Sequence, residues 1–120
     1  RVEFQRRSIC YLTDTEHDPG PLDTNILGLI DGADIAIYDG MYTDDEYKAR
    51  IGWGHSTWQE GARLCEAAKV GQYVVFHHDP DHDDDFMDEI ARKVAKTRPG
   101  SIVAREGMVL RPGNLEPEDA

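Results

Sequence analysis

Four side chains suited to metal binding or proton transfer stand where apolar segments end or helical segments begin. Asp14, Asp39 and His77 each follow a short apolar, β-branched segment, and His55 precedes a segment with helical patterning. Because functional groups gather past the carboxyl ends of strands in α/β sheets, we expect all four to project into one cleft. Imidazole and carboxylate together suit a borderline divalent metal such as zinc, with manganese or iron as alternatives.

Each of these residues also has an interpretation without chemistry. Aspartate at a strand end commonly accepts hydrogen bonds from nearby backbone N–H groups, which is a sufficient role for Asp14 or Asp39 alone. Histidine at a junction between loop and helix, as at His55, is commonly a cap or a surface residue. The occurrence of all four at the ends of predicted elements is what favours a common site.

The acidic run at 79–85 invites interpretation as a calcium-binding loop, and its spacing argues against that. If Asp79 is the first ligand, Asp84 stands where the sharp turn needs glycine and Ile90 stands where a bidentate glutamate belongs. The helix macrodipole favours acids at a helix N-terminus, so we expect this run to open a helix. A phosphate-binding glycine loop, a Gly-x-Ser-x-Gly elbow and a Cys-x-x-Cys pair are all missing from the sequence.

Strands and helices alternate along the chain, which argues for an α/β layer. The apolar segments 8–13, 33–38 and 72–76 are typical of buried strands. We predict helices over 22–30, after the capping pair Thr43 and Glu46, from Thr57 to Gly71, and from Phe86 to a Pro99-Gly100 stop. Residues 102–104 and 108–110 are predicted to close the chain as a hairpin.

The charge balance restricts the class of partner. The chain has 120 residues with 13 Lys+Arg against 24 Asp+Glu, a net charge of −11, and 39% hydrophobic residues, enough for one core. It lacks the basic footprint of a nucleic-acid or anionic-membrane surface, and it has no apolar run of the roughly 18 residues that a membrane span needs. Cys10 and Cys65 stand among apolar neighbours and are expected to be reduced core thiols. We therefore expect a cytoplasmic protein that does not bind membranes or nucleic acids.

Four short segments with chemistry-bearing residues follow one another in a particular order. They are Tyr11-Leu12-Thr13-Asp14-Thr15-Glu16-His17, Ala33-Asp34-Ile35-Ala36-Ile37-Tyr38-Asp39, Gly54-His55-Ser56-Thr57 and Val75-Phe76-His77-His78-Asp79-Pro80. Together they resemble the second half of a metallo-β-lactamase-fold hydrolase of the phosphodiesterase-like branch, which includes ribonuclease Z and cyclic phosphodiesterases. The resemblance covers residues 8 to 110.

This resemblance implies a role for each candidate residue. Asp14 becomes a carboxylate bridging two divalent metal ions, His77 a terminal ligand of one of them, and His55 the acid that protonates the leaving group. Asp39 takes the place of an acid that orients His55, although the family's usual residue there is glutamate. The implied reaction is hydrolysis by a metal-activated water, and the acidic surface favours a small phosphodiester or similar ester as substrate.

One departure from the family is large. The His-x-His-x-Asp-His segment and the single histidine that follows it in the family have no match in this sequence. The resemblance therefore implies an α/β fold that is one βα half of a four-layer αββα sandwich, formed by residues 1–111 and followed by an acidic tail at 112–120. One half alone leaves an apolar sheet face uncovered, so we expect a separate N-terminal half or self-association.

Two other functions stay open. The first is a non-catalytic acidic α/β module that binds a protein partner through the sheet face or a cation through residues 79–85. The second keeps the same fold but acts on a carbonyl group in a lactone, thioester or β-lactam, against which the His55-Ser56-Thr57 segment argues. If the chain is half of an enzyme, we expect it to be inactive on its own.

Overall fold

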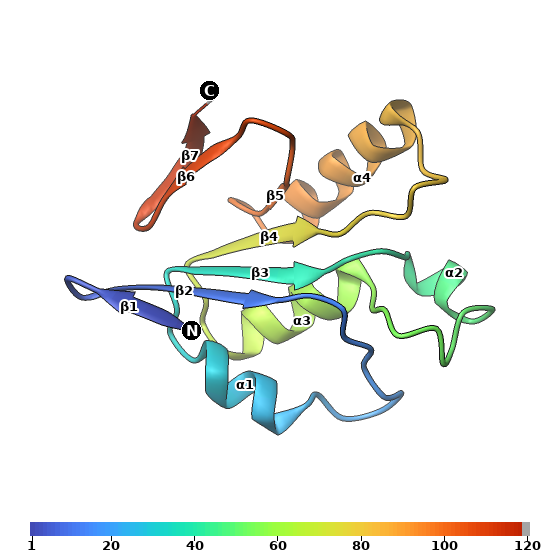
Figure 1. Ribbon diagram of the computed structural model, residues 1–120, viewed down its shortest axis with the longest axis horizontal. Coiled ribbons are helices and arrows are strands. Elements are labelled where there is room, and N and C mark those ends of the chain that lie inside the picture. Colours follow the sequence, from blue (N-terminus) through green and yellow to red (C-terminus); the bar gives the residue numbers. More distant parts are fainter. Residues whose placement is uncertain (119–120) are drawn as a thin grey trace.

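The computed structural model describes residues 1–118, and a five-stranded sheet forms its centre (Figure 1). The strand order is β1-β2-β3-β4-β5; β2 to β5 run parallel, and β1 pairs antiparallel with β2. The strands are β1 (Val2–Phe4), β2 (Arg7–Leu12), β3 (Ile35–Asp39), β4 (Gln72–Phe76) and β5 (Ile102–Val103). The carboxyl ends of the three central strands therefore lie side by side.

Four helices connect the parallel strands, and two of them, α2 and α3, begin directly after the predicted caps Thr43 and Thr57. They are α1 (Thr24–Ile30), α2 (Asp44–Tyr47), α3 (Trp58–Ala67) and α4 (Asp84–Thr97). Thr43 and Glu46 form the complete capping box that the sequence predicts. Thr57 caps α3, but the Glu60 side chain pairs with Arg63 instead of returning to the cap. The predicted α/β class is confirmed.

One face of the sheet packs against the helices. Alternate residues of the central strands point to this face, and Cys10, Tyr38, Tyr73 and Val75 join the core formed with α3 and α4. Figure 1 shows α3 behind the sheet. Cys10 and Cys65 are both buried and free, as expected from their apolar surroundings.

The predicted closing hairpin is wrong. Residues 102–103 form β5, which pairs parallel with β4 at the open edge of the sheet. The hairpin instead joins β6 (Val109–Arg111) to β7 (Asn114–Glu118) through Pro112 and Gly113, whose φ of 89° favours glycine. In this position β5 lies beside Val74 and Val75, which are both buried, and burial of apolar surface stabilises the pairing. Most of the predicted acidic tail is therefore β7, and residues 119–120 lie outside the described residues.

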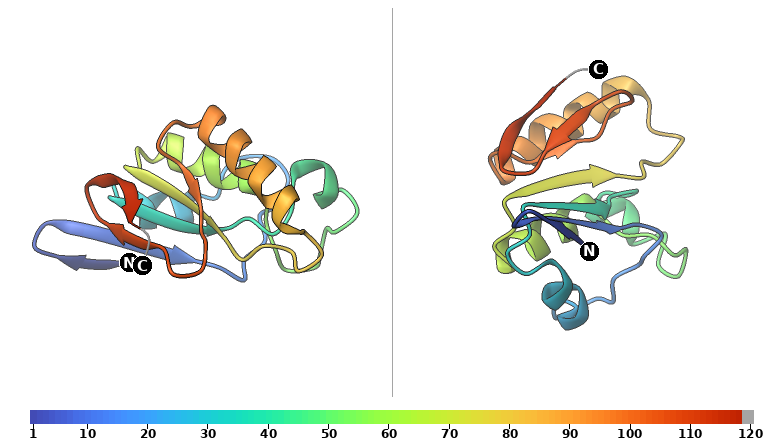
Figure 2. Two further views of the ribbon diagram at one scale, coloured as in Figure 1. Left: turned by 90° about the horizontal axis from the view of Figure 1, so that it is seen from above. Right: turned by 60° about the vertical axis from the view of Figure 1, so that its left-hand side comes forward.

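The face opposite the helices is partly open. The β6–β7 hairpin lies along this side of the sheet, and the Gln72 side-chain amide donates to the Leu115 carbonyl at 2.8 Å (Figure 2). Strand register places Val2, Phe4, Tyr11 and Phe76 on the same face, and they are 70%, 72%, 61% and 37% exposed. These four residues are called the open face below. No helix within residues 1–118 is long and apolar enough to cross a membrane.

Candidate active site

Two of the four candidate residues have an unusual backbone conformation. Asp14, two residues beyond β2, has a φ of 53°, and His77, the first residue after β4, has a φ of 65°. Residues other than glycine rarely adopt positive φ, and such conformations are concentrated at functional sites. The left-handed residue turns the chain away from the strand direction, so each side chain lies at the carboxyl edge of the sheet.

Asp39, at the end of β3, is the buried centre of the site. Its side chain is fully buried, and its Oδ2 atom lies 2.9 Å from His55 Nδ1 and 3.2 Å from His77 Nδ1. Its Oδ1 atom accepts hydrogen bonds from the backbone N–H groups of Ser56 and Met41 at 3.2 and 3.3 Å. A buried carboxylate is tolerated only when paired and hydrogen-bonded, and Asp39 has partners on both oxygens.

The shared carboxylate determines which ring nitrogens of the two histidines remain without a partner in the cluster. Since Nδ1 of each ring lies at Asp39, Nε2 of His55 and of His77 is the atom left for a metal ion or a substrate. A carboxylate behind a histidine fixes its tautomer and its orientation. The two rings meet edge to face, with centroids 4.9 Å apart and an interplanar angle of 70°.

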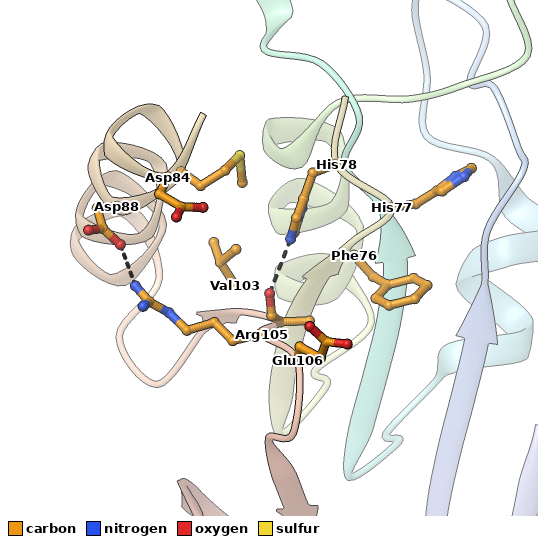
Figure 3. A pocket seen from close by; sticks show the side chains of 10 residues that line it. Phe76, His77, His78, Asp84, Asp88, Val103, Arg105 and Glu106 are labelled. Atoms are coloured by element: carbon orange, nitrogen blue, oxygen red, sulfur yellow. Dashed lines mark hydrogen bonds and ion pairs between the residues drawn. The ribbon is translucent and has the colours of Figure 1, made fainter. Parts of the chain in front are cut away.

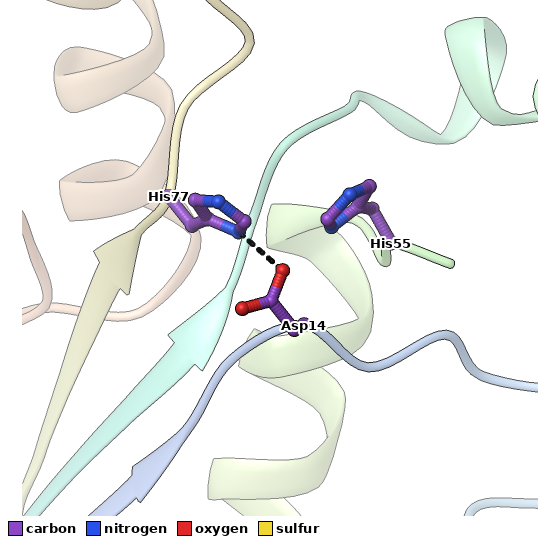
Figure 4. Close-up of side chains that lie close together, drawn as sticks. All are labelled: Asp14, His55 and His77. Carbon is purple, nitrogen blue, oxygen red and sulfur yellow. Dashed lines mark ion pairs between the residues drawn. The ribbon is translucent and has the colours of Figure 1, made fainter. Parts of the chain in front are cut away.

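The structure brings three potential metal ligands together (Figure 4). Asp14, His55 and His77 each offer one ligand atom, and these atoms all lie within 4.8 Å of one another. Asp14 Oδ1 lies 3.8 Å from His77 Nδ1, which is too long for a hydrogen bond. Carboxylate and imidazole groups are donors that suit zinc. The side chains present therefore fit a divalent metal ion.

His78 points away from this group. Its Nε2 atom lies 3.1 Å from the Ala104 carbonyl oxygen. His78 lines a cavity of about 710 Å³ between α4 and residues 103–106; His77 also contributes to this lining, but Figure 3 shows its ring pointing away from His78. The cavity lining includes Phe76 and Met87 as well as Arg105, which pairs with Asp88. The side chains of the two adjacent histidines therefore have different partners: His77 contacts Asp39, and His78 contacts the Ala104 carbonyl.

Two aspartates of the acidic run at 79–85 accept hydrogen bonds from backbone N–H groups close to them in sequence. Asp83 caps α4 by accepting from the Phe86 N–H at 2.8 Å, and Asp79 accepts from the Asp81 N–H at 2.9 Å. Within residues 1–118, the one group of potential metal ligands is the one at the strand ends. The prediction that this run opens a helix is confirmed.

The sequence pattern alone assigns no role to Glu16. Its carboxylate accepts from the backbone N–H groups of Gly52 and Gly54, both at 2.7 Å, in the loop that carries His55. An acid two residues after Asp14 and a Gly-x-Gly segment before His55 were the available signals, but they lie 36 residues apart. Only the fold shows that they meet.

The comparisons with known proteins decide the family. The sequence profile of the beta-lactamase superfamily domain matches residues 1–78. The chain belongs to the beta-lactamase superfamily. The matched segment ends directly after His77, so this superfamily match includes Asp14, Asp39 and His55 as well.

One curated relative makes the resemblance more specific. A ribonuclease Z from Exiguobacterium sp. (strain ATCC BAA-1283 / AT1b) is 28% identical over 85 residues, which are 68% of this chain and 27% of that protein. The predicted resemblance to a part of a metallo-β-lactamase-fold protein similar to ribonuclease Z is confirmed. The chain spans about a quarter of the length of this relative.

Proposed function

We propose that this chain supplies part of a hydrolase site that binds divalent metal and cleaves a phosphodiester or similar ester. The observation that carries the proposal is the meeting of Asp14, His55 and His77 around the buried Asp39 carboxylate. Membership in the beta-lactamase superfamily and the similarity to a ribonuclease Z support hydrolysis. The acidic surface favours a small substrate over a nucleic acid.

Asp14 and His77 are the proposed metal ligands. Their carboxylate and imidazole groups suit zinc, with manganese or iron as alternatives, and the resemblance implies that Asp14 would hold both of two ions. A bound divalent ion supplies a water that ionises near neutral pH and a positive charge beside the phosphate. The Asp39 carboxylate holds the His77 ring in place for this role.

His55 is proposed to protonate the leaving oxygen. Its Nδ1 atom lies at Asp39, so Nε2 is the atom that can give a proton to a substrate, and Asp39 stabilises the ring while it carries that proton. Proton transfer by a positioned side chain contributes typically 10²–10⁴-fold to a rate. His55 is therefore treated as an acid here and not as a ligand.

Two ligands do not hold a metal ion tightly, so the proposed site needs more than this chain. Tight zinc sites use three or four protein ligands. The chain spans 27% of the ribonuclease Z that it resembles, and its open face carries exposed apolar side chains. We propose that another part of the same polypeptide, carrying the His-x-His-x-Asp-His segment of the resembling family, covers the open face and completes the site.

Two histidine substitutions test this function in the complete protein. We expect His77→Ala to lose metal, measured by elemental analysis, and to lose phosphodiesterase activity. We expect His55→Ala to keep its metal and to lose about 10²-fold in turnover, because only the proton donor is removed. An activated substrate such as bis(p-nitrophenyl) phosphate, whose leaving group needs no proton, should recover part of that loss.

His78→Ala is the matched control, because His78 contacts the Ala104 carbonyl and not the cluster. It should retain both metal and turnover. If neither His77→Ala nor His55→Ala changed metal content or activity, the site would have no catalytic role. The chain would then be better explained as a non-catalytic binding module. Loss of metal in His55→Ala would make His55 a ligand and remove its role as the acid.

A further inference from the structure

The loop that carries His55 has little regular structure of its own. Residues 51–54 are exposed, and Gly52 and Gly54 have φ values of 88° and 91°. Backbone bonds anchor the loop on its far side, where Tyr42 N–H donates to the Ser56 carbonyl at 3.1 Å. Asp39 contacts the His55 ring and the Ser56 N–H, and the direction of His55 depends further on contacts that hold the glycine segment before it.

The Glu16 carboxylate makes those contacts. One oxygen accepts from the Gly52 N–H and the other from the Gly54 N–H, each at 2.7 Å, so the carboxylate bridges the two glycines. The Tyr47 hydroxyl lies 2.8 Å from Oε2 and 2.8 Å from the His17 carbonyl oxygen, and its one proton serves one of them at a time. The two backbone hydrogen bonds lower the pKa of Glu16, that from Gly52 most, which keeps the carboxylate ionised.

The neighbouring residue holds the other side of His55. His17 Nδ1 lies 2.6 Å from Ser56 Oγ, and the His17 ring stacks on Tyr47 with centroids 4.6 Å apart. Tyr38, in β3, donates its hydroxyl proton to the same Ser56 oxygen at 3.0 Å. Glu16 and His17 thus fix the residues before and after His55, and both follow Asp14 closely in sequence.

We propose that Glu16 is a positioning residue, whose carboxylate fixes the Gly52–Gly54 segment and thereby sets the direction of His55 toward Asp14 and His77. The inference rests on the proposed function of His55 as a proton donor. Glu16 touches neither histidine of the cluster, and its partners are two backbone N–H groups of an exposed loop and the Tyr47 hydroxyl. The Tyr47 hydroxyl keeps the His17 carbonyl as a partner when the Glu16 carboxylate is lost. Loss of the Glu16 carboxylate therefore frees the loop without removing core contacts, and an error of about 1 Å in a reacting group costs up to about 100-fold in rate.

The test is Glu16→Gln in the complete protein, with two substrates that differ only in the leaving group. Phenyl methyl phosphate needs a proton on its leaving oxygen, and p-nitrophenyl methyl phosphate needs far less help. We expect kcat for the phenyl ester to fall about tenfold or more, with a smaller fall for the nitrophenyl ester and little change in KM or metal content. Amide hydrogen exchange at Gly52 and Gly54 should become faster.

Glu89→Gln is the matched control, since Glu89 is a hydrogen-bonded glutamate on the exposed side of α4. It should leave both kinetic constants and the exchange of the two glycines unchanged. An equal fall with both substrates in Glu16→Gln, or no fall at all, would overturn the positioning role while leaving the proposed function intact.

The two proposals can fail separately. If the unaltered, metal-loaded protein hydrolysed neither ester, the phosphodiesterase proposal would fall, and hydrogen exchange alone would decide about Glu16. Faster exchange confined to residues 52–55 in Glu16→Gln would then support the clamp on the loop. Unchanged exchange there would overturn it.

Discussion

At the scale of single residues, Asp39 is the most deeply buried acid within residues 1–118, at 0% exposed against 5% for Glu60. A carboxylate that is fully buried at the end of β3 must be compensated, and two histidines and two backbone N–H groups do so. The sequence places an acid after an apolar strand, which predicts its position. It does not predict that His55 and His77 share one oxygen, because that depends on the path of the loop before His55.

The positions of Asp14, Asp39 and His77 could be predicted because parallel strands end at a common edge of the sheet. The position of His55 follows from no such rule. Its loop is fixed by Glu16 across 36 residues of sequence, and this contact has no periodicity that a sequence pattern reveals. The left-handed conformations of Asp14 and His77 were equally hidden, since glycine is the residue that normally indicates positive φ.

Asp34 gives a prediction about pH. Its carboxylate accepts from the Ser8 N–H at 2.8 Å and lies 3.0 Å from an Arg7 nitrogen, which joins the start of β2 to β3. The Ser8 backbone bond contributes most to lowering the pKa of Asp34, and it outweighs the opposing effect of burial. A lowered folded-state pKa gives stability that is present above the unfolded pKa, near 4, and is lost as pH falls through the folded value.

We therefore expect Asp34→Asn to lower the free energy of unfolding by about 1.5 kcal/mol at pH 7, the contribution of hydrogen bonds to a charged group. The difference from the unaltered chain should shrink as pH falls below about 4. Urea denaturation between pH 3 and pH 7 measures it. A difference that stayed constant over this range would show that the charge of Asp34 contributes nothing to the fold.

At the scale of elements, α3 approaches the sheet closely because of a glycine. A Cβ atom at Gly61 would lie 2.5 Å from Tyr73 Cζ and 2.8 Å from Tyr38 Cδ1. Tyr73 is held in place, since its hydroxyl donates to the Trp58 carbonyl at 2.8 Å. We expect Gly61→Ala to destabilise the fold by about 1–3 kcal/mol through overpacking, although alanine favours helices by about 1 kcal/mol.

Gly28 in α1 is the matched control for this prediction. A Cβ atom there meets nothing within 4 Å. Gly28→Ala should raise the free energy of unfolding by up to about 1 kcal/mol, since only helix propensity changes. Equal effects of the two substitutions in chemical denaturation would mean that α3 and β4 can separate freely, against the close approach that the structure shows.

Local sequence patterns predict the helix caps but not the pairing of the last strand of the sheet. The capping residues of α2 and α3 were predictable, because the hydrogen bonds of a helix N-terminus are local. The pairing of β5 was not, because two short apolar segments near the C-terminus fit a hairpin with each other as well as an edge position beside β4. The edge position is adopted because it buries residues 102–103 beside β4, a strand some thirty residues earlier in the chain. A local sequence pattern does not contain this information.

At the scale of the whole molecule, the helices cover one side of the sheet and the open face remains on the other. Tyr11 and Phe76 pack their rings together there, with centroids 5.9 Å apart, yet they stay exposed. Burying one such side chain contributes roughly 1.5–3 kcal/mol. The proposed occupant is the rest of the polypeptide, and in its absence a second copy of the chain can cover the same side chains.

We therefore expect the 120-residue chain, produced alone, to self-associate at high concentration in sedimentation experiments. Copies with a net charge of −11 repel one another, so association should strengthen when salt screens that charge. Substituting Phe4→Ser together with Tyr11→Ser should weaken it about tenfold or more, since each step of 1.4 kcal/mol is a factor of ten. Both side chains are largely exposed, so the fold should survive the change.

Trp53→Ser tests whether self-association depends on the open face specifically or on exposed apolar side chains in general. Trp53 is 62% exposed, as much as Tyr11, but it lies in the loop before His55 and beneath the Arg50 guanidinium, 4.7 Å from its ring. Its substitution should leave the association constant unchanged. Equal weakening by Trp53→Ser and by the double substitution would show that association follows total apolar exposure. The open face would then have no specific complement, and the site at the strand ends would have to obtain its missing ligands elsewhere.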